Sequence, residues 1–317
     1  MPILLVKTSS LGDVVHNLPV VSDLHRRFPT LAIDWVVEEA FVDIPRLHPA
    51  VRQVIPVAVR RWRRALTAAA TWREMAEFRR RLRTGGYDAV LDTQGLVKSA
   101  LIAAQAGGRK IGYAREAARE PLAARFYDRS FVIPKNLHAV ERNRWLAAAA
   151  LDYSADQPLD YGIAAAPMTV EWLPAAPYAV LLTATSRADK QWPQAGWQAL
   201  AAWLAERGIV PVLPAGSAGE RKFAATLAAT MPGGIAAPPL AIGDLARLFA
   251  GAQIVIGVDT GLTHLAAALG RPTIGLYGAT DPLLTGVHAG ERAVNLGGIG
   301  QAPSAAEVIA QAASLLD

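Results

Sequence analysis

Residues 254–272 read IVIGVDTGLTHLAAALGRP, and this stretch decides the fold class. Five apolar residues, 254–258, are followed by a short polar loop and then by the apolar spacing of a helix over 261–269. A buried strand that passes through such a loop into a helix is the repeating unit of parallel sheets. We therefore expect an α/β protein in which the carboxyl ends of the strands carry the chemistry.

The same alternation of short strands and amphipathic helices runs through the whole chain. In the first half it predicts strands at 2–7, 32–37, 52–57, 88–92 and 130–133, and helices at 13–27, 65–83, 96–106 and 138–150. In the second half it predicts strands at 178–183, 209–213, 235–237, 254–258 and 273–277, and helices at 194–206, 219–230, 242–250 and 261–269. This order is typical of parallel sheets with helices on both faces.

The middle of the chain lacks this periodicity, because residues 154–177 contain four prolines and no regular apolar spacing. A chain of 317 residues is long enough for two cores of about 150 residues each. We expect two doubly wound, Rossmann-like domains that face each other across a cleft. Their predicted bounds are 1–155 and 178–317, with a linker at 156–177, and the C-terminal helix is a candidate to pack back on the first domain.

The composition favours a cytoplasmic protein. The chain has no cysteine, so it forms neither disulfides nor thiolate metal sites. Its apolar runs are too short to span a bilayer, and Lys7 and Asp13 interrupt the N-terminal run where a signal peptide is apolar.

Charge is spread unevenly along the chain. Residues 1–150 hold 24 Lys and Arg against 14 Asp and Glu, whereas residues 151–317 hold 8 against 13. The positive balance of the first half predicts an anionic partner for that half. Charge alone does not distinguish nucleic acid, an acidic membrane surface and a phosphorylated lipid.

The loop after the strand at 254–258 is the first candidate site. The free N–H groups and the dipole at a helix start favour an anion. Gly261 allows a phosphate to approach the backbone, the Thr260 and Thr263 hydroxyls add donors, and His264 lies one turn into the helix. In the alternative interpretation, Asp259 or Thr260 only caps the helix and His264 is a core residue.

Two further loops of the second half carry compatible groups. Thr185, Ser186 and Lys190 follow the strand at 178–183, where a lysine among hydroxyls suits a phosphate. Glu220 follows the strand at 209–213, where a carboxylate accepts hydrogen bonds from ribose hydroxyls. Three such loops at one sheet edge predict a nucleotide pocket. The motifs G-x-G-x-x-G, G-x-x-x-x-G-K-[ST] and G-x-S-x-G are absent, which weakens dinucleotide oxidoreductase, P-loop and α/β-hydrolase functions.

Two arginine-rich stretches stand out in the first half. RRRLR at 79–83 ends a predicted helix and is interpreted as a solvated face that suits the helix dipole. RRWRR at 60–64 follows a strand, and we expect a loop on the cleft side that holds an anionic acceptor through arginine forks. The predicted anion-binding residues are Arg60, Arg61, Arg63 and Arg64, with Lys98 and Arg119 as weaker members. Beyond Trp62 the stretches lack interleaved stacking aromatics, which disfavours nucleic acid.

The first strand-to-helix turn carries a carboxylate. VKTSSLGDVVHNLP at 6–19 contains one glycine, Gly12, followed by Asp13. A negative charge at this point repels a phosphate, so this turn is not the nucleotide site. A helix cap is the structural interpretation of Asp13, since the helix N-terminus favours a negative charge.

Motifs along almost the whole chain resemble, in order, those of the bacterial lipopolysaccharide heptosyltransferases of glycosyltransferase family 9. They are KTSSLGDVVHNLPV, RRWRR, DTQGLVKSA, TATSRADKQWP, GSAGE and VDTGLTHLAAALGRPTIGLYGATDP. SSLGD and TQGLVKSA are more similar to type I than to type II of this family. The resemblance implies a GT-B fold and a transferase of lipopolysaccharide core biosynthesis. The implied reaction moves L-glycero-D-manno-heptose from ADP-heptose to the first Kdo of Kdo2-lipid A, with inversion.

The resemblance also implies a role for each candidate residue. Asp13 would be the general base that deprotonates the acceptor hydroxyl, and the arginine-rich domain would hold the acceptor. On the donor side, Thr185, Ser186, Lys190, Thr260, Gly261 and His264 would surround the diphosphate, Asp259 the heptose, Glu220 the ribose and Leu240 the adenine. Leu240 and Ser186 stand where relatives carry other residues of similar use. No metal is expected, because the chain has no D-x-D motif.

The implied location is the cytoplasm, in peripheral contact with the anionic cytoplasmic face of the inner membrane. Two alternatives stay open. One is heptosyltransferase II or a related nucleotide-sugar glycosyltransferase. The other is a non-catalytic protein that binds anionic glycolipid or nucleic acid through its arginine-rich domain.

Overall fold

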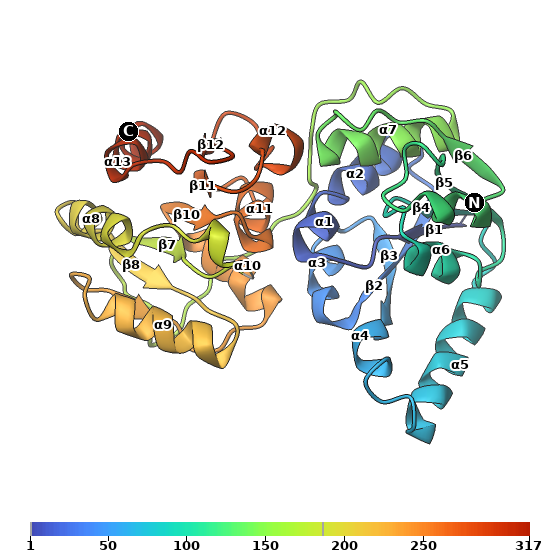
Figure 1. Cartoon of the computed structure of the whole chain (residues 1–317), viewed down its shortest axis with the longest axis horizontal. Helices are drawn as coiled ribbons and strands as arrows, with labels where there is room; N and C mark the ends of the chain where they lie inside the picture. The colour runs from blue at the N-terminus through green and yellow to red at the C-terminus, as the bar shows by residue number, and fades with distance from the viewer. Residues whose placement is uncertain (1, 186) are drawn as a thin grey trace. The chain divides into compact units, whose positions relative to one another are not determined.

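The computed structural model describes residues 2–185 and 187–317. Ser186, a predicted donor-binding residue, lies outside the described residues. The chain forms two compact units, Met1–Gly162 and Ile163–Asp317, and the residues expected to form a linker are divided between them. Each unit contains a parallel sheet of six strands with helices packed against it (Figure 1), which confirms the predicted α/β class.

The first unit has the strand order β3-β2-β1-β4-β5-β6. Its strands are β1 (Pro2–Val6), β2 (Ala32–Glu38), β3 (Val51–Val57), β4 (Ala89–Asp92), β5 (Arg109–Tyr113) and β6 (Arg129–Phe131). Its helices are α1 (Leu11–Val15), α2 (Leu18–Arg27), α3 (Asp43–Arg46), α4 (Val59–Trp62), α5 (Ala69–Thr84), α6 (Val97–Ala103) and α7 (Ala139–Leu151), with 3-10 turns η1 (Glu39–Phe41) and η2 (Pro121–Phe126).

The second unit has the strand order β12-β11-β10-β7-β8-β9. Its strands are β7 (Tyr178–Leu182), β8 (Val210–Leu213), β9 (Ile235–Ala236), β10 (Ile254–Val258), β11 (Thr273–Tyr277) and β12 (Ala293–Gly297). Its helices are α8 (Gln194–Ala205), α9 (Ala218–Ala228), α10 (Ile242–Gly251), α11 (Gly261–Ala268), α12 (Pro282–Thr285) and α13 (Ala305–Leu316), with the 3-10 turn η3 (Ala188–Lys190).

Both units therefore repeat one topology. Counted within each unit, the strands follow the Rossmann order 3-2-1-4-5-6. The order reverses between β1 and β4 in the first unit and between β7 and β10 in the second, and these pairs are hydrogen-bonded neighbours. Ligands of doubly wound sheets bind outside the carboxyl ends of the strands at such a reversal.

Several predicted elements differ from the structure. β5 and β12 were not predicted, because β5 begins with two charged residues and β12 is a short edge strand that contains Asn295. The helix predicted at 13–27 is interrupted at His16 and Asn17, between α1 and α2. RRWRR was expected in a loop, but 60–62 belong to α4, because Trp62 donates its N–H to the Ala58 carbonyl and buries its ring against Phe78.

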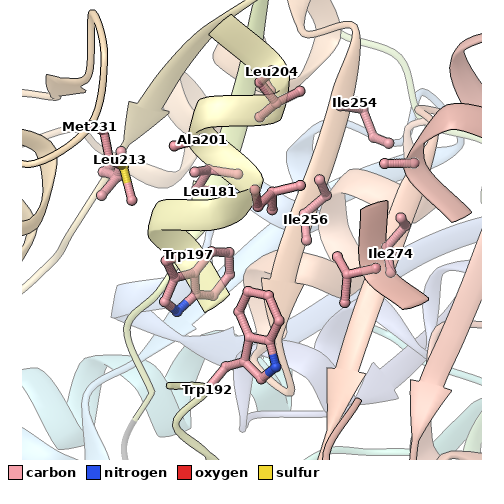
Figure 2. Close-up of a cluster of buried hydrophobic side chains, with 14 of the residues drawn as sticks. Leu181, Trp192, Trp197, Ala201, Leu204, Leu213, Met231, Ile254, Ile256 and Ile274 are labelled. Atoms are coloured by element: carbon pink, nitrogen blue, oxygen red, sulfur yellow. The ribbon is translucent and has the colours of Figure 1, made fainter. Parts of the chain in front are cut away.

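The core of the second unit forms between α8 and the sheet (Figure 2). Trp197 on α8 is fully buried and meets Trp192 edge to face, with ring centroids 5.0 Å apart. Leu204 and Ala201 continue the buried face of α8 toward Ile254 and Ile256 of β10. The C-terminal helix α13 contributes Val308 and Ala312 to this same core, so its apolar face is used within the second unit.

Across the described residues, no helix combines the length and the apolar character needed to cross a bilayer.

Candidate active site

In the first unit, the loop after β1 is hydrogen-bonded to the loop after β4. The Gln94 side-chain oxygen accepts hydrogen bonds from the Thr8 N–H and hydroxyl, both at 2.8 Å, and its amide donates to the Ser9 carbonyl. The Gln94 N–H in turn donates to the buried Asp92 carboxylate at 2.8 Å. These bonds hold the two loops together at the point where the strand order reverses.

Asp13 lies in the first turn of α1, directly after the loop that follows β1. Its carboxylate accepts hydrogen bonds from the Ser10 N–H at 2.9 Å and from the Arg119 Nη1 at 3.2 Å, and it forms an ion pair with Arg119. The side chain is 15% exposed, so it is largely buried but still reaches solvent. The bond to Ser10 is the helix cap considered above, and it leaves Asp13 able to accept a further proton.

A buried lysine, Lys7, lies close to Asp13 and directly follows β1. Its ammonium donates to the Thr93 carbonyl at 2.8 Å and to the Asn143 side chain at 3.2 Å. Burial lowers the pKa of Lys7 to about 8, partly offset by the negative charge of Asp13. The position of Lys7 beside Asp13 was not predicted. A lysine at the end of a buried strand is nevertheless the sequence feature that could have identified it.

Burial alone would raise the pKa of Asp13. The charges of Lys7 and Arg119 and the hydrogen bonds from Arg119 and Ser10 outweigh burial and hold this pKa well below its usual value. Asp13 is therefore ionised at any physiological pH, and its negative charge is balanced by two cations.

The predicted acceptor residues lie in and directly after α4, in α6 and in the segment after β5. Arg119 contacts Asp13, and the Lys98 ammonium donates to the Ser9 hydroxyl at 2.7 Å, so both lie beside the loop that leads to Asp13. Arg61 forms ion pairs with Glu39 and Glu74, and the Arg60 guanidinium lies 5.6 Å from the centre of the Phe41 ring. Arg63 and Arg64 are exposed, and among the described residues their side chains form no ion pair.

In the second unit, the corresponding cluster is centred on Asp259 at the end of β10. Its Oδ2 accepts hydrogen bonds from the Lys190 ammonium and from the Thr280 hydroxyl, both at 2.6 Å. The His264 Nε2 lies 3.9 Å from Oδ1. Burial would raise the pKa of Asp259, but His264, Lys190 and Thr280 hold it well below its usual value.

This cluster joins three loops, which follow β7, β10 and β11. Thr280 was not predicted, although it lies in the motif segment GATDP and follows a strand adjacent to β10. Gly257 in β10 permits the close packing of α11, since a Cβ there would lie 2.4 Å from the Thr263 hydroxyl oxygen. The fully buried Thr263 donates this hydroxyl to the Val258 carbonyl, so the expectation that it serves a ligand was wrong.

The remaining predicted donor residues surround the same sheet edge. Thr260 is the N-cap residue of α11 and its side chain caps no N–H, while Gly261 is the first residue of this helix. Thr185 is half-buried in the loop after β7, and Leu240 is half-buried in the segment after β9. The Glu220 carboxylate accepts hydrogen bonds from the Ser217 N–H at 2.8 Å and the Gly216 N–H at 3.2 Å, in a capping box at the start of α9.

No group of three or more His, Cys, Asp or Glu side chains within residues 2–185 and 187–317 is placed to hold a metal ion. In the described part of the second unit, the cationic groups at the sheet edge include Lys190, the positive end of α11 and Arg187, which is paired with Asp189.

Comparison with solved structures assigns the two Rossmann-like units to the GT-B class of glycosyltransferases. Escherichia coli heptosyltransferase WaaC with ADP superposes with a TM-score of 0.90 at 44% identity, covering 97% of this chain and 98% of the other. Its complex with ADP-2-deoxy-2-fluoro heptose gives 0.84 at 42% identity, covering 99% and 98%.

Sequence comparisons agree with the structural ones. The profile of glycosyltransferase family 9 (heptosyltransferase) matches residues 75–311. Lipopolysaccharide heptosyltransferase 1 of Pseudomonas aeruginosa is 47% identical over 94% of this chain and 84% of its own length. The protein of the same name from E. coli K12 is 48% identical over 90% of each chain. The chain belongs to glycosyltransferase family 9, the heptosyltransferases.

The charge balance around Asp13 leads to a prediction. Arg119→Met should raise the pKa of the Asp13 carboxyl by about 1–3 units, because it removes one cation and its hydrogen bonds while burial still disfavours the carboxylate. The pKa is measured by NMR titration of carbon-13-labelled aspartate. Arg115→Met, which changes an exposed arginine of the same loop, is the matched control and should leave it in place. Equal pKa values in both variants would show that Arg119 does not control this carboxyl.

Proposed function

We propose that this chain transfers L-glycero-D-manno-heptose from ADP-heptose to the first Kdo of Kdo2-lipid A, with inversion at the anomeric carbon. The first unit binds the acceptor and supplies the base, and the second unit binds the donor. Three kinds of support favour this function. They are membership of the heptosyltransferase family, the complexes of the similar WaaC protein with ADP and with ADP-2-deoxy-2-fluoro heptose, and the two charged clusters described above.

The ionised Asp13 carboxylate is the observation that carries the proposal. An inverting displacement needs one base for the acceptor hydroxyl and stabilisation of the leaving diphosphate. Asp13 is partly exposed and is held in its anionic form by Lys7 and Arg119. Its low pKa makes it a weak base toward a free alcohol. Proton transfer to Asp13 is therefore expected to accompany formation of the new C–O bond, which makes the hydroxyl proton acidic.

The groups around Asp13 favour an acidic acceptor. Arg119 and Lys98 place two cations beside the base, and the Arg60–Arg64 segment adds more on the same sheet edge. A Kdo carboxylate and lipid A phosphates are ligands that arginine forks hold bidentately. Arg61 is already paired with Glu39 and Glu74, so Arg63 and Arg64 are the better candidates within this segment.

On the donor side, the positive charge for the leaving ADP comes from Lys190 and the start of α11. The Lys190 ammonium has three donors, and Asp259 is its hydrogen-bond acceptor within the described chain. The remaining donors can reach a diphosphate oxygen, as can the free N–H groups at Thr260 and Gly261. In this proposal, Asp259 binds the heptose, Glu220 binds the ribose and Leu240 lies against the adenine.

The acceptor is a lipid, so we place the protein on the cytoplasmic face of the inner membrane, in peripheral contact with its anionic surface. The excess of Lys and Arg in the first half supports this placement. Attraction to an anionic leaflet amounts to roughly 1 kcal/mol per well-placed basic residue and weakens with salt.

A transfer assay with two acceptors, with and without EDTA, tests the function directly. Purified protein with ADP-heptose should release ADP when Kdo2-lipid A is present, should release little with an acceptor that already carries the first heptose, and should continue in EDTA. Mass spectrometry of the acceptor verifies the added heptose. Preference for the heptosylated acceptor would assign type II activity. Loss of activity in EDTA would contradict the proposed roles of Lys190 and α11 as the cationic groups.

Substitution of Lys190 tests the donor site. Lys190→Met should weaken ADP binding by roughly 10- to 100-fold, because a charge-assisted hydrogen bond to the diphosphate contributes about 1.5–3 kcal/mol. Affinity is measured by isothermal titration calorimetry. Lys222→Met, at an exposed position on α9, is the matched control and should bind ADP as the unmodified chain does. Unchanged affinity in Lys190→Met would move the diphosphate away from this loop.

A further inference from the structure

A cavity of about 640 Å³ lies in the first unit, between α4, the long helix α5 and the end of α6. Its volume is in the range of about 300–1,000 Å³ that is typical of small-molecule sites. The walls are mainly apolar, and their large side chains are Val57, Trp62, Leu66, Trp72, Met75 and Ile102. Figure 1 shows α5 running obliquely along the margin of the first unit, with the α4–α5 connection at its end.

The rim of this cavity is positively charged. Arg63 comes from the α4–α5 connection, and Arg79 and Arg83 lie four residues apart on α5, so they project from the same helix face. Within residues 2–185 and 187–317, these three side chains form no ion pair or hydrogen bond. Among the residues that the structure describes, no Asp or Glu lines the cavity. The interpretation of 79–83 as a merely solvated face therefore misses that three of its arginines, Arg79, Arg80 and Arg83, border an apolar cavity.

Two large apolar side chains at this cavity are exposed to solvent. Trp72 is 56% exposed and Leu66 is 51% exposed. The Trp72 indole N–H donates to the Leu66 carbonyl at 2.8 Å, which fixes the ring beside the α4–α5 connection. Exposed apolar side chains around an apolar hollow mark a surface that binds an apolar partner. An amphipathic tryptophan suits the boundary between an apolar chain and a polar head group.

We propose that this cavity binds an acyl chain of the phosphorylated glycolipid acceptor, with a phosphate of the same molecule on Arg63, Arg79 and Arg83. This rests on the function proposed above. Mainly apolar walls whose charged lining residues are all arginines match a ligand with an apolar tail and an anionic head. A sugar or nucleotide would leave its hydroxyl groups without acceptors on these walls. Arg63 also belongs to the predicted acceptor-binding segment, so the cavity continues the acceptor surface rather than forming a separate one.

The test compares acylated Kdo2-lipid A with the same acceptor after removal of its acyl chains, both in one non-ionic detergent. The quantity measured is the ratio of kcat/KM for the acylated acceptor to kcat/KM for the deacylated one. Trp72→Ser and Met75→Glu should each lower this ratio by about tenfold or more, since they remove apolar contact or place a charge beside the chain. Trp145→Ser changes an exposed tryptophan of α7 and is the matched control.

The arginine rim is tested with a second pair of variants. Arg79→Ala should raise KM for a deacylated acceptor that keeps its phosphates more than for one from which the phosphates have been removed. Arg73→Ala, on α5 but outside the cavity, should not make this distinction. Circular dichroism checks that every variant keeps its helix content.

The outcomes separate this inference from the function on which it rests. If the unmodified chain transfers heptose to neither acceptor, the proposed function fails. If it uses both acceptors and the ratio is the same in Trp72→Ser, Met75→Glu and Trp145→Ser, the acyl-chain site is wrong while the function stands. If the ratio is unchanged but the cavity variants lose binding to anionic vesicles that lack the acceptor, the cavity binds bilayer lipid. That result would overturn the proposal that it binds the acceptor.

Discussion

The order in which parallel strands are added to each sheet determines where both charged clusters form. In each unit the chain places two strands on one side of the first strand and then the next three on the other side. The loops after the first and fourth strands therefore lie beside each other but lead to helices that diverge, which leaves room for side chains at the sheet edge. In the first unit, Asp13 lies after β1 and Gln94 lies after the neighbouring strand β4. In the second unit, Lys190 lies after β7 and its partner Asp259 lies after the neighbouring strand β10.

The two clusters stabilise a partly buried carboxylate with different sets of neighbouring groups. Each holds a partly buried carboxylate in its ionised form against the cost of burial. In the first unit the balancing charges are Lys7 and Arg119, and in the second the balance comes from Lys190 with the Thr280 hydroxyl and His264. A partly exposed carboxylate suits proton acceptance, whereas one bonded to a lysine helps to orient that lysine toward an anion.

The sequence predicted the fold class and the strands that lead into the sites, because apolar runs followed by glycine and small polar residues identify these strand-to-helix turns. It did not predict β5, whose first residues are Arg109 and Lys110, since pairing with β4 overrides their low apolar content. The GT-B class required the family resemblance, because alternating strands and helices are common to many doubly wound proteins.

Site residues were predictable as far as their loops, but not in their pairing. Lys7 is 86 and 136 residues away in sequence from Thr93 and Asn143, which accept hydrogen bonds from its ammonium, and its burial follows only from the packed sheet. Arg61 is occupied by Glu39 of η1 and Glu74 of α5, which are 22 and 13 residues away in sequence and approach it only in the folded unit. Thr263 looked like a ligand donor because its position on the turn is polar, but helix packing turns its hydroxyl to the Val258 carbonyl.

The most direct test of the account is the rate of heptose transfer by Asp13→Asn, measured in single turnovers at saturating donor together with the affinity for ADP-heptose. Asparagine keeps the size and most hydrogen bonds of the aspartate but cannot accept the proton. The account predicts that the rate falls by a factor on the order of 10²–10⁴ while the donor dissociation constant changes less than about threefold. A transfer rate within a few-fold of the unmodified chain, with equal donor affinity, would contradict the assignment of Asp13 as the base.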